Sequence, residues 1–447
     1  MTVAAQVGRA TDRFVSGEEM MRWIAELFPI CRSITGDGVR ETLKRIQQWL
    51  PLQIYEVPSG KQVFDWTVPP EWNVRDAYVK DSRGTRVIDF QENNLHVVSY
   101  SAPVRKKMSF SELREHLHTL PDRPDWVPYR TSYYKEDWGF CLRHRDLARL
   151  SDTEYEVRID SSLEAGHLTY GEAVLPGEAE DEVLISCHIC HPSLANDNLS
   201  GIAVAVALAR ALQDAAHHYT YRFIFVPGTI GAITWLALNE PNLQRITHGL
   251  VLAGVGDSAP LTYKKSRRGN AEIDRAAQEA LRHSAPGARA IDFSPYGYDE
   301  RQYCSPGLNL PLGRLSRAPH GEFPEYHTSA DNLDFVGPEP LADSLAVVKE
   351  IAFILENNWV YENLSPKCEP QLGKRGLYRA IGGLPDPGRR ELAMLWVLNQ
   401  SDGANGLLDI AERSGIEFRL LHEAARDLEE ADLLRKARFP AFARGRR

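Results

Sequence analysis

The 447-residue chain has few cysteines, no apolar run of membrane-spanning length and no excess of basic residues. Six cysteines are too few for a disulfide framework, so we expect a cytoplasmic protein. The first residues also lack the apolar segment of a signal peptide, and we expect no membrane association. The net charge of −9 disfavours general affinity for nucleic acid. A hydrophobic content of 43% is ordinary for a globular protein, and the length predicts two to four domains.

One stretch gathers polar residues between a predicted strand and a predicted helix. Residues 181–188 form an apolar run after acidic residues, which predicts a buried strand, and small apolar residues at 202–212 predict a helix. Between them lie Cys187, His188, Cys190, His191 and Asp197. Ligands of open α/β folds bind where strands end and helices begin, and imidazole and carboxylate groups suit zinc. The stretch therefore predicts a metal site, although Asp197 could instead serve only as a helix cap.

The same stretch matches the C-x-x-C-H spacing of haem attachment. That chemistry normally requires export, and Cys187 would have to lie at the end of a buried strand. We therefore favour packed thiols near the site, with Cys190 as a weak ligand candidate. A lone histidine is more often a packing residue, and this interpretation also stays open for His191.

The spacing of apolar residues changes along the chain. Apolar spacing predicts helices at 18–28 and 39–50, joined by a polar glycine turn that either lines a pocket or merely connects them. Residues 58–150 alternate between short apolar segments and turns, which predicts an antiparallel β module rich in aromatic residues. From residue 151 strands and helices alternate, as in an α/β domain with a mixed sheet.

Polar residues follow several of the predicted strands of this α/β region. The strands near 181–188, 219–227 and 248–257 lead to His188, Gly228 and Asp257, and the loop after a fourth strand carries His327. The carboxyl ends of parallel strands meet at one edge of a sheet, so we expect His188, Asp257 and His327 to lie close together. A local capping role predicts no such convergence.

The C-terminal region follows a linker rich in proline and glycine at about 365–388. Residues 389–436 contain three helical patterns, and the spacing around 410–417 is typical of a winged helix-turn-helix, for which DNA binding is the first function to consider. Its second helix carries more acidic than basic residues and would repel phosphate. We therefore expect a packing or oligomerisation module, compatible with a homo-oligomer.

These motifs together carry a resemblance. The order His188, Asp197-Asn-x-Ser-Gly, a strand into Gly228-Thr-Ile-Gly, Val-Gly-Asp257 and Tyr-His327-Thr resembles the zinc aminopeptidases of the M28 type. The chain is still more similar to bacterial aminopeptidase-like domain proteins (domain of unknown function 4910), which carry an inserted β module (domain of unknown function 2172) and a winged-helix domain. The segments that support this closer similarity are Arg32-Ser-Ile-Thr-Gly-Asp-Gly, Phe64-Asp-Trp-Thr-Val-Pro, Ser132-Tyr-Tyr-Lys-Glu-Asp-Trp-Gly-Phe-Cys and Glu325-Tyr-His-Thr-Ser-Ala-Asp-Asn-Leu-Asp.

The resemblance implies an α/β fold with three parts. Residues 1–57 and 151–360 would form an aminopeptidase-like core around a mixed sheet. Residues 58–150 would be the inserted β-rich domain, and residues 365–447 a winged-helix-like C-terminal domain.

The resemblance also implies a zinc site. Its metal ligands would be His188, Asp197, Asp257 and His327. Related enzymes hold two zinc ions and use a Glu-Glu pair, where this chain has Gly228 and Thr229, so we expect one zinc rather than two. M28 enzymes also carry an aspartate at the position of Cys190.

Without a carboxylate at position 228, no obvious residue takes a proton from the attacking water. Glu325, Glu322 or His191 would have to replace it. Tyr298, Arg301 and Tyr326 are expected to bind the substrate.

Three functions stay open. The chain is expected to be a zinc-dependent aminopeptidase-like hydrolase that cleaves an amide or peptide bond of a small amino-acyl substrate. Alternatively, the scaffold performs metal-assisted acyl transfer or cyclisation, as glutaminyl cyclases with the M28 fold do. In the third case it binds zinc or a small ligand without turnover, in a biosynthetic pathway. The expected partner is a small-molecule or peptide-like substrate.

Overall fold

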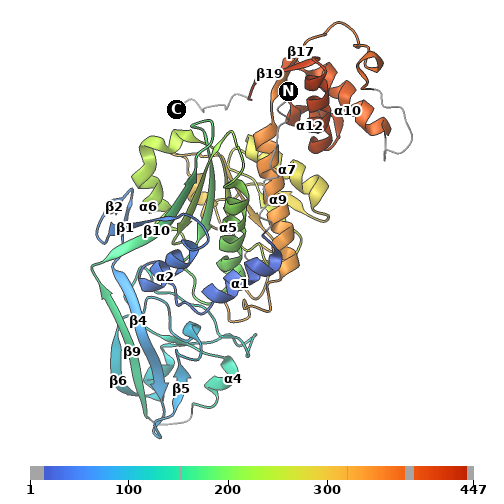
Figure 1. Ribbon diagram of the computed structural model, residues 1–447. Coiled ribbons are helices and arrows are strands. Elements are labelled where there is room, and N and C mark those ends of the chain that lie inside the picture. The colour runs from blue at the N-terminus through green and yellow to red at the C-terminus, as the bar shows by residue number, and fades with distance from the viewer. Residues whose placement is uncertain (1–14, 151–153, 320, 378–386, 440–447) are drawn as a thin grey trace, which may run out of the picture.

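The computed structural model describes residues 15–150, 154–319, 321–377 and 387–439. The described chain forms a central mixed sheet flanked by helices, a smaller sheet and a C-terminal helical domain (Figure 1). The smaller sheet and the C-terminal domain lie at opposite ends of the core. The first residues, in which we expected no signal peptide, lie outside the described residues, as does part of the linker near 365–388.

The central sheet has eight strands in the order β1-β10-β12-β11-β13-β16-β14-β15. These are β1 (Gln53–Pro58), β10 (His167–Leu175), β12 (Thr220–Val226), β11 (Glu182–His188), β13 (Ile246–Leu252), β16 (Leu312–Ser316), β14 (Thr262–Lys264) and β15 (Arg289–Ile291). The four central strands β12, β11, β13 and β16 run parallel. Strands β10 and β14 flank them in antiparallel orientation. The predicted mixed sheet is therefore confirmed.

Alternate side chains of the central strands enter two different cores. Val183 and Ile185 of β11 pack into one apolar cluster, whereas Leu184 packs into another. The first cluster includes residues of helices α1 (Gly17–Leu27), α2 (Asp37–Ile46), α5 (Gly201–Leu212), α7 (Glu272–Ser284) and α9 (Pro338–Asn357). The second includes residues of α6 (Ile230–Asn239). Because the side-chain period of a strand is two, a sheet covered on both faces reads as a continuous apolar run.

The smaller sheet has the strand order β5-β4-β9-β6. Its strands are β5 (Arg86–Asp89), β4 (Glu71–Lys80), β9 (Glu154–Glu164) and β6 (Val104–Ser109), and the short elements around it are β2 (Gln62–Val63), β3 (Trp66–Thr67), η1 (Asn94–His96), α3 (Phe110–Arg114), β7 (Leu117–His118), β8 (Phe140–Cys141) and α4 (His144–Leu147). Strand β9 pairs with β4 and β6, so this sheet extends past residue 150, where we expected the β module to end.

The C-terminal domain combines three strands and three helices. They are β17 (Val360–Asn363), β18 (Asp402–Gly406), β19 (Leu434–Arg438), α10 (Pro387–Gln400), α11 (Leu407–Ser414) and α12 (Phe418–Glu430). Strand β17 begins before residue 365, the expected start of this domain. Helix α12, the second helix of the helix-turn-helix, packs on α9: Arg419 forms an ion pair with Glu350 and lies over the ring of Phe353 at 4.0 Å.

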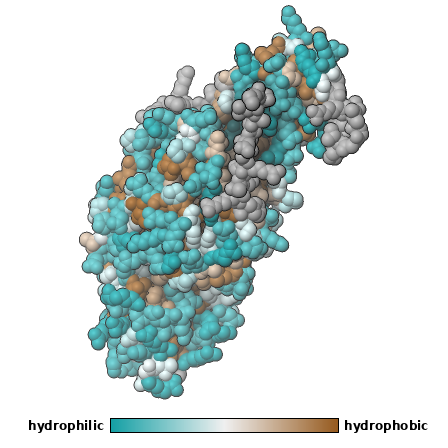
Figure 2. Space-filling view, in the orientation of Figure 1, coloured by the Kyte–Doolittle hydropathy of each residue, from teal (hydrophilic) through white to brown (hydrophobic). Residues whose placement is uncertain are grey.

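The remaining helical elements are the turn η2 (Ala195–Ser200), η3 (Glu240–Arg245), η4 (Gly373–Arg375) and α8 (Glu300–Tyr303). No helix in the described part of the chain combines the length and the apolar character needed to cross a membrane. The face of the molecule in Figure 2 is mainly hydrophilic, with apolar residues in separate patches.

Candidate metal centre

Three imidazoles surround one carboxylate at the carboxyl end of β11. His188 is the last residue of β11, and Asp197 lies in η2 between β11 and α5. The Oδ1 atom of Asp197 lies 2.7 Å from Nε2 of His188. Its Oδ2 atom lies 3.1 Å from Nε2 of His327 and 3.9 Å from Nε2 of His191. Ligand atoms of His188, His191 and Asp197 all lie within 4.8 Å of one another.

The spacing of these side chains, and the lack of hydrogen bonds at two of their atoms, fit a zinc ion. Ligands about 2.0–2.1 Å from a tetrahedral zinc lie roughly 3.3 Å apart, which is close to the separations around Asp197. Oδ2 of Asp197 and Nε2 of His327 are buried, and neither makes a hydrogen bond. Leaving such atoms unpaired is costly, whereas a cation between them would satisfy both.

The charges in the group are those of metal ligands. Burial would raise the pKa of Asp197, but His191 and His188 hold that pKa well below its ordinary value. Burial lowers the pKa of His191 to about 3. Asp197 is therefore anionic, which is the protonation state in which a carboxylate binds a metal.

The backbone around Asp197 is held from a distant part of the sequence. Both carboxylate oxygens of Asp331 accept backbone N–H groups, from Asn196 at 2.6 Å and from Asp197 at 3.0 Å. The side chain of Asn198 donates to the carbonyl of Leu252 at 2.9 Å. These bonds fix η2 against the ends of the neighbouring strands and so fix the orientation of the carboxylate.

The β module holds His327 in place. The N–H of Tyr129 donates to the carbonyl of His327 at 2.8 Å, and the N–H of Ser329 donates to Val127 at 2.8 Å. The φ angle of His327 is 56°, in a region that non-glycine residues rarely adopt. The ring of Tyr129 lies edge-on to His191 and His327, with centroids 5.3 and 5.1 Å away. Residues of the predicted β module therefore line the candidate metal centre.

A buried arginine holds the loop of His191. Nε of Arg32 donates to the carbonyl of His191 at 2.8 Å, and its Nη1 donates to Leu27 at 2.7 Å. The polar glycine turn that joins the first two helices thus supports the site instead of merely connecting those helices.

Asp257 lies outside this group, contrary to our expectation. Its Oδ1 accepts the N–H of Ala259 at 2.8 Å, and its Oδ2 accepts the Asn196 side chain at 2.9 Å and the N–H of Ala318 at 3.3 Å. Strand β13 ends at Leu252, five residues earlier than the expected strand, so Asp257 follows a turn instead of a strand. From the sequence, His191 could be either a general base or a packing residue. The structure places it among the candidate ligands around Asp197.

The position of the missing glutamate faces the site. A Cβ atom on Gly228 would lie 3.3 Å from the Cys190 sulfur and 3.7 Å from Cβ of His188. The next residue, Thr229, donates its N–H to Oδ1 of Asp299 at 2.7 Å, while Oδ2 of Asp299 is buried without a hydrogen bond. Burial raises the pKa of Asp299, and the charge of His188 acts in the opposite direction. Sequence reasoning missed this carboxylate, although the dense polar run that contains it was visible.

The other expected site residues fall into two groups. Tyr298 stacks on His188 with centroids 5.4 Å apart, and Tyr326 stacks on His327 at 3.9 Å. Glu322 instead forms an exposed ion pair with Arg289. Glu325 is half-buried, and its backbone carbonyl accepts the N–H of Thr328. Neither glutamate side chain forms a hydrogen bond or an ion pair with the three imidazoles or with Asp197.

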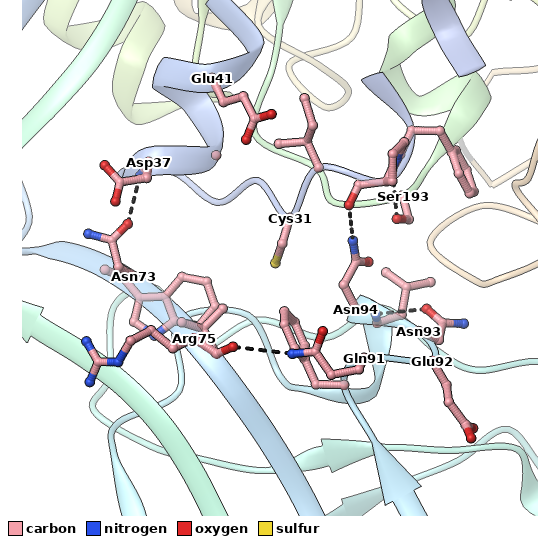
Figure 3. Close-up of a pocket in the computed structure, with 18 of the residues that line it drawn as sticks. Cys31, Asp37, Glu41, Asn73, Arg75, Gln91, Glu92, Asn93, Asn94 and Ser193 are labelled. Carbon is pink, nitrogen blue, oxygen red and sulfur yellow. Dashed lines mark hydrogen bonds between the residues drawn. The ribbon is translucent and has the colours of Figure 1, made fainter. Parts of the chain in front are cut away.

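A cavity of about 1060 Å³ lies beside the centre but does not contain it. None of the three histidines or Asp197 lines this cavity, which is bounded by the α1–α2 connection and the smaller sheet. In Figure 3 the side chains of Cys31 and Glu41 point toward the same space. Ser193 and Ser329, two residues beyond His191 and His327, line it from the core.

Comparison with known proteins fits this architecture. Residues 21–358 match the model of the domain of unknown function DUF4910, and residues 359–436 match a winged helix-turn-helix. The chain belongs to the DUF4910 family. A Clostridium acetobutylicum protein, named as a polysaccharide biosynthesis protein with an aminopeptidase-like domain, is 54% identical over 94% of this chain and 96% of its own.

Solved structures support the same fold for this DUF4910 protein. A crystal structure from Clostridium acetobutylicum, named as a peptidase, has 52% identity and a TM-score of 0.90, covering 94% of this chain and 96% of that one. A zinc aminopeptidase from Bacillus subtilis has 14% identity and a TM-score of 0.56, covering 76% of this chain and 95% of that one. The aminopeptidase-like core and the C-terminal winged helix are thus confirmed.

Proposed function

We propose that this DUF4910 protein is a zinc-dependent hydrolase that cleaves the amide or peptide bond of a small amino-acyl substrate. The observation that carries this proposal is the group of three imidazoles around the Asp197 carboxylate, with two buried atoms that lack hydrogen bonds. The likeness of the fold to zinc aminopeptidases supports it. Bound zinc would supply Lewis-acid polarisation of the amide carbonyl.

One zinc ion fits the chain better than two. His188, His191 and Asp197, whose ligand atoms lie within 4.8 Å of one another, would hold that ion, and His327, 3.1 Å from Oδ2 of Asp197, is the candidate for the fourth ligand of a tetrahedral site. A second ion would need the carboxylates that Gly228 and Thr229 do not supply, and Asp257 is engaged by three N–H donors.

Asp299 is the best placed proton acceptor. Its Oδ1 is fixed by the N–H of Thr229, and its Oδ2 carries no hydrogen bond within the protein. Because Asp299 bonds to the turn that follows β12, its carboxylate lies next to the position where the resemblance expects a glutamate. We assign to Oδ2 of Asp299 the proton that the attacking water loses, in place of Glu325, Glu322 and His191.

A second function, zinc binding without turnover, is favoured by the number of ligands. Catalytic zinc sites usually have three protein ligands and an open position, whereas four protein ligands are typical of structural sites. The hydrolase would then need His191, whose Nε2 is 3.9 Å from Asp197, to leave room for the substrate.

Steady-state hydrolysis by the zinc-loaded protein distinguishes the two functions. On a panel of fluorogenic amino-acyl amides, we expect measurable turnover that Asp299→Asn lowers by about 10²–10⁴-fold, the usual effect of losing a general base. Zinc content should not change in this variant, because Asp299 is not among the four ligands. Stoichiometric zinc with no turnover on any amide would favour the second function.

A further inference from the structure

The cavity between the core and the β module has the size of a ligand site. Its volume is about 1060 Å³, and it is bounded by the α1–α2 connection on one side and by β4 and the turn after β5 on the other. Ligand pockets usually measure about 300–1,000 Å³, so there is room for a ligand of more than one ring. A ligand in this cavity would be bound by different side chains from those around Asp197.

The charged residues that line the cavity are mostly acidic. They are Asp37, Glu41, Glu92 and Glu164. The carboxylate of Glu41 forms only a long ion pair within the described chain, with Arg45 at 3.8 Å. Arg75 is the single cation among the described lining residues, and Asp160 already binds its guanidinium. The cavity therefore disfavours anions such as phosphate and favours a ligand with a positive charge.

Neutral polar groups supply much of the remaining lining. Among them are the amides of Asn73, Gln91 and Asn94 and the hydroxyls of Thr35 and Ser162. Amides and hydroxyls each offer both hydrogen-bond donors and acceptors. They are therefore suited to a ligand with several hydroxyl groups, because each hydroxyl also donates and accepts.

Hydrogen bonds within the protein hold these polar groups in place. The Oδ1 atom of Asn73 accepts the N–H of Asp37 at 2.7 Å, and Nε2 of Gln91 donates to the carbonyl of Arg75 at 3.3 Å. In Figure 3 Glu41 points into the space from α2, and Gln91 borders it from the side of the smaller sheet. Groups that are already ordered lose little entropy when a ligand binds.

Aromatic side chains complete the lining. Phe28 and Phe90 are half-buried, and Trp72 is fixed by the bond of its Nε1–H to the carbonyl of Ser101 at 2.8 Å. Aromatic rings supply apolar contact area for a flat group. A sugar ring has such a face, formed by its C–H groups, whereas a metal ion or a linear amine has none.

We propose that this cavity binds an amino sugar, a hydroxylated ring that carries a primary amine. The ammonium group lies toward the Glu41 carboxylate, the hydroxyls bind the amide side chains, and the C–H face of the ring contacts the aromatic side chains. This inference goes beyond the proposed function, because the binding residues are separate from the metal centre and binding does not require zinc.

Calorimetry with sugars and a linear amine tests the site. Chitobiose with free amines is a glucosamine disaccharide, and cellobiose has the same two rings with hydroxyls in place of the amines. Putrescine has two amines and no ring. Binding is measured on the full chain, zinc-loaded and chelator-treated, at about pH 6, where carboxylates are ionised and amines protonated. We expect the amino disaccharide to bind at least about tenfold more tightly than either cellobiose or putrescine.

Matched variants assign the effect to residues. Glu41→Gln, at a side chain that is 54% exposed, should lower the affinity for the amino disaccharide toward that for cellobiose. Gln91→Ala, at an exposed residue, should weaken both sugars. Glu430→Gln, at an exposed glutamate of the C-terminal domain, should change neither affinity.

Four results would each overturn the proposal. They are no binding of the amino disaccharide at about 10 mM, equal binding of cellobiose, equal binding of putrescine, and an unchanged preference for the amine in Glu41→Gln. Binding of the amino disaccharide to chelator-treated protein would support the site even if no amide were hydrolysed. Amide hydrolysis without sugar binding would leave the proposed function intact and refute the site.

Discussion

Replacing His191 and Asp257 separately tests which of the two belongs to the metal centre. His191→Ala removes an imidazole whose Nε2 lies 3.9 Å from Oδ2 of Asp197. Loss of residues that merely orient ligands costs roughly 10–100-fold in metal affinity, so loss of a ligand should cost at least about 100-fold. That factor corresponds to about 2.7 kcal/mol of binding free energy.

Asp257→Asn should lower the unfolding free energy and leave the zinc affinity nearly unchanged. The Asp257 carboxylate accepts N–H groups from Ala259, Asn196 and Ala318, at 2.8, 2.9 and 3.3 Å. An asparagine retains one acceptor oxygen, so at least one of these buried donors loses its partner, which costs about 1–3 kcal/mol of unfolding free energy. Zinc affinity should remain within a few-fold of the wild type.

Both effects can be measured on the same preparations. Zinc affinity comes from competition with a chromophoric chelator, and unfolding free energy comes from urea titration with excess chelator. His422→Ala, at a histidine of the C-terminal domain, is the control for loss of an imidazole away from the site. The assignment of ligands would be refuted if Asp257→Asn lost zinc while His191→Ala retained it.

Three further outcomes follow from burial and packing. Cys368 is exposed and should react first with a thiol reagent. Burial raises the pKa of Cys190 to about 12, so this thiol should react only after unfolding. More than one fast-reacting thiol per folded chain would contradict this expectation. Burial lowers the pKa of His248 to about 3, so the unfolded state binds more protons below pH 6.5 and stability falls as the pH falls. Between pH 7 and pH 5 the wild type should therefore lose about 2 kcal/mol more than His248→Gln in urea titrations, and equal losses would refute the attribution. Because α12 packs on α9 through Arg419, a mobility-shift assay should show no salt-dependent DNA binding at micromolar protein; a shift that rises as salt falls would overturn this.

Local patterns in the sequence were sufficient to predict many of the helices and strands and to indicate the family. The apolar run at β11 and the small residues of α5 predict a buried strand and a helix, because periodicity and burial are properties of short segments. The same stretch showed that His188 and Asp197 are candidate ligands, and its motifs indicated an aminopeptidase-like core. Zinc itself and the roles of these residues stay predictions.

Only the tertiary structure decided which distant side chains meet. The apolar residues after Leu252 continue the pattern of β13, so the sequence could not show that the strand ends there and that Asp257 turns toward Asn196. Likewise, no local pattern tells that Tyr129 would hold His327, because that contact joins loops of two sheets about 200 residues apart in the chain. Distant side chains meet because whole layers pack together. Many weak contacts determine this packing, and no single segment of the sequence predicts their sum.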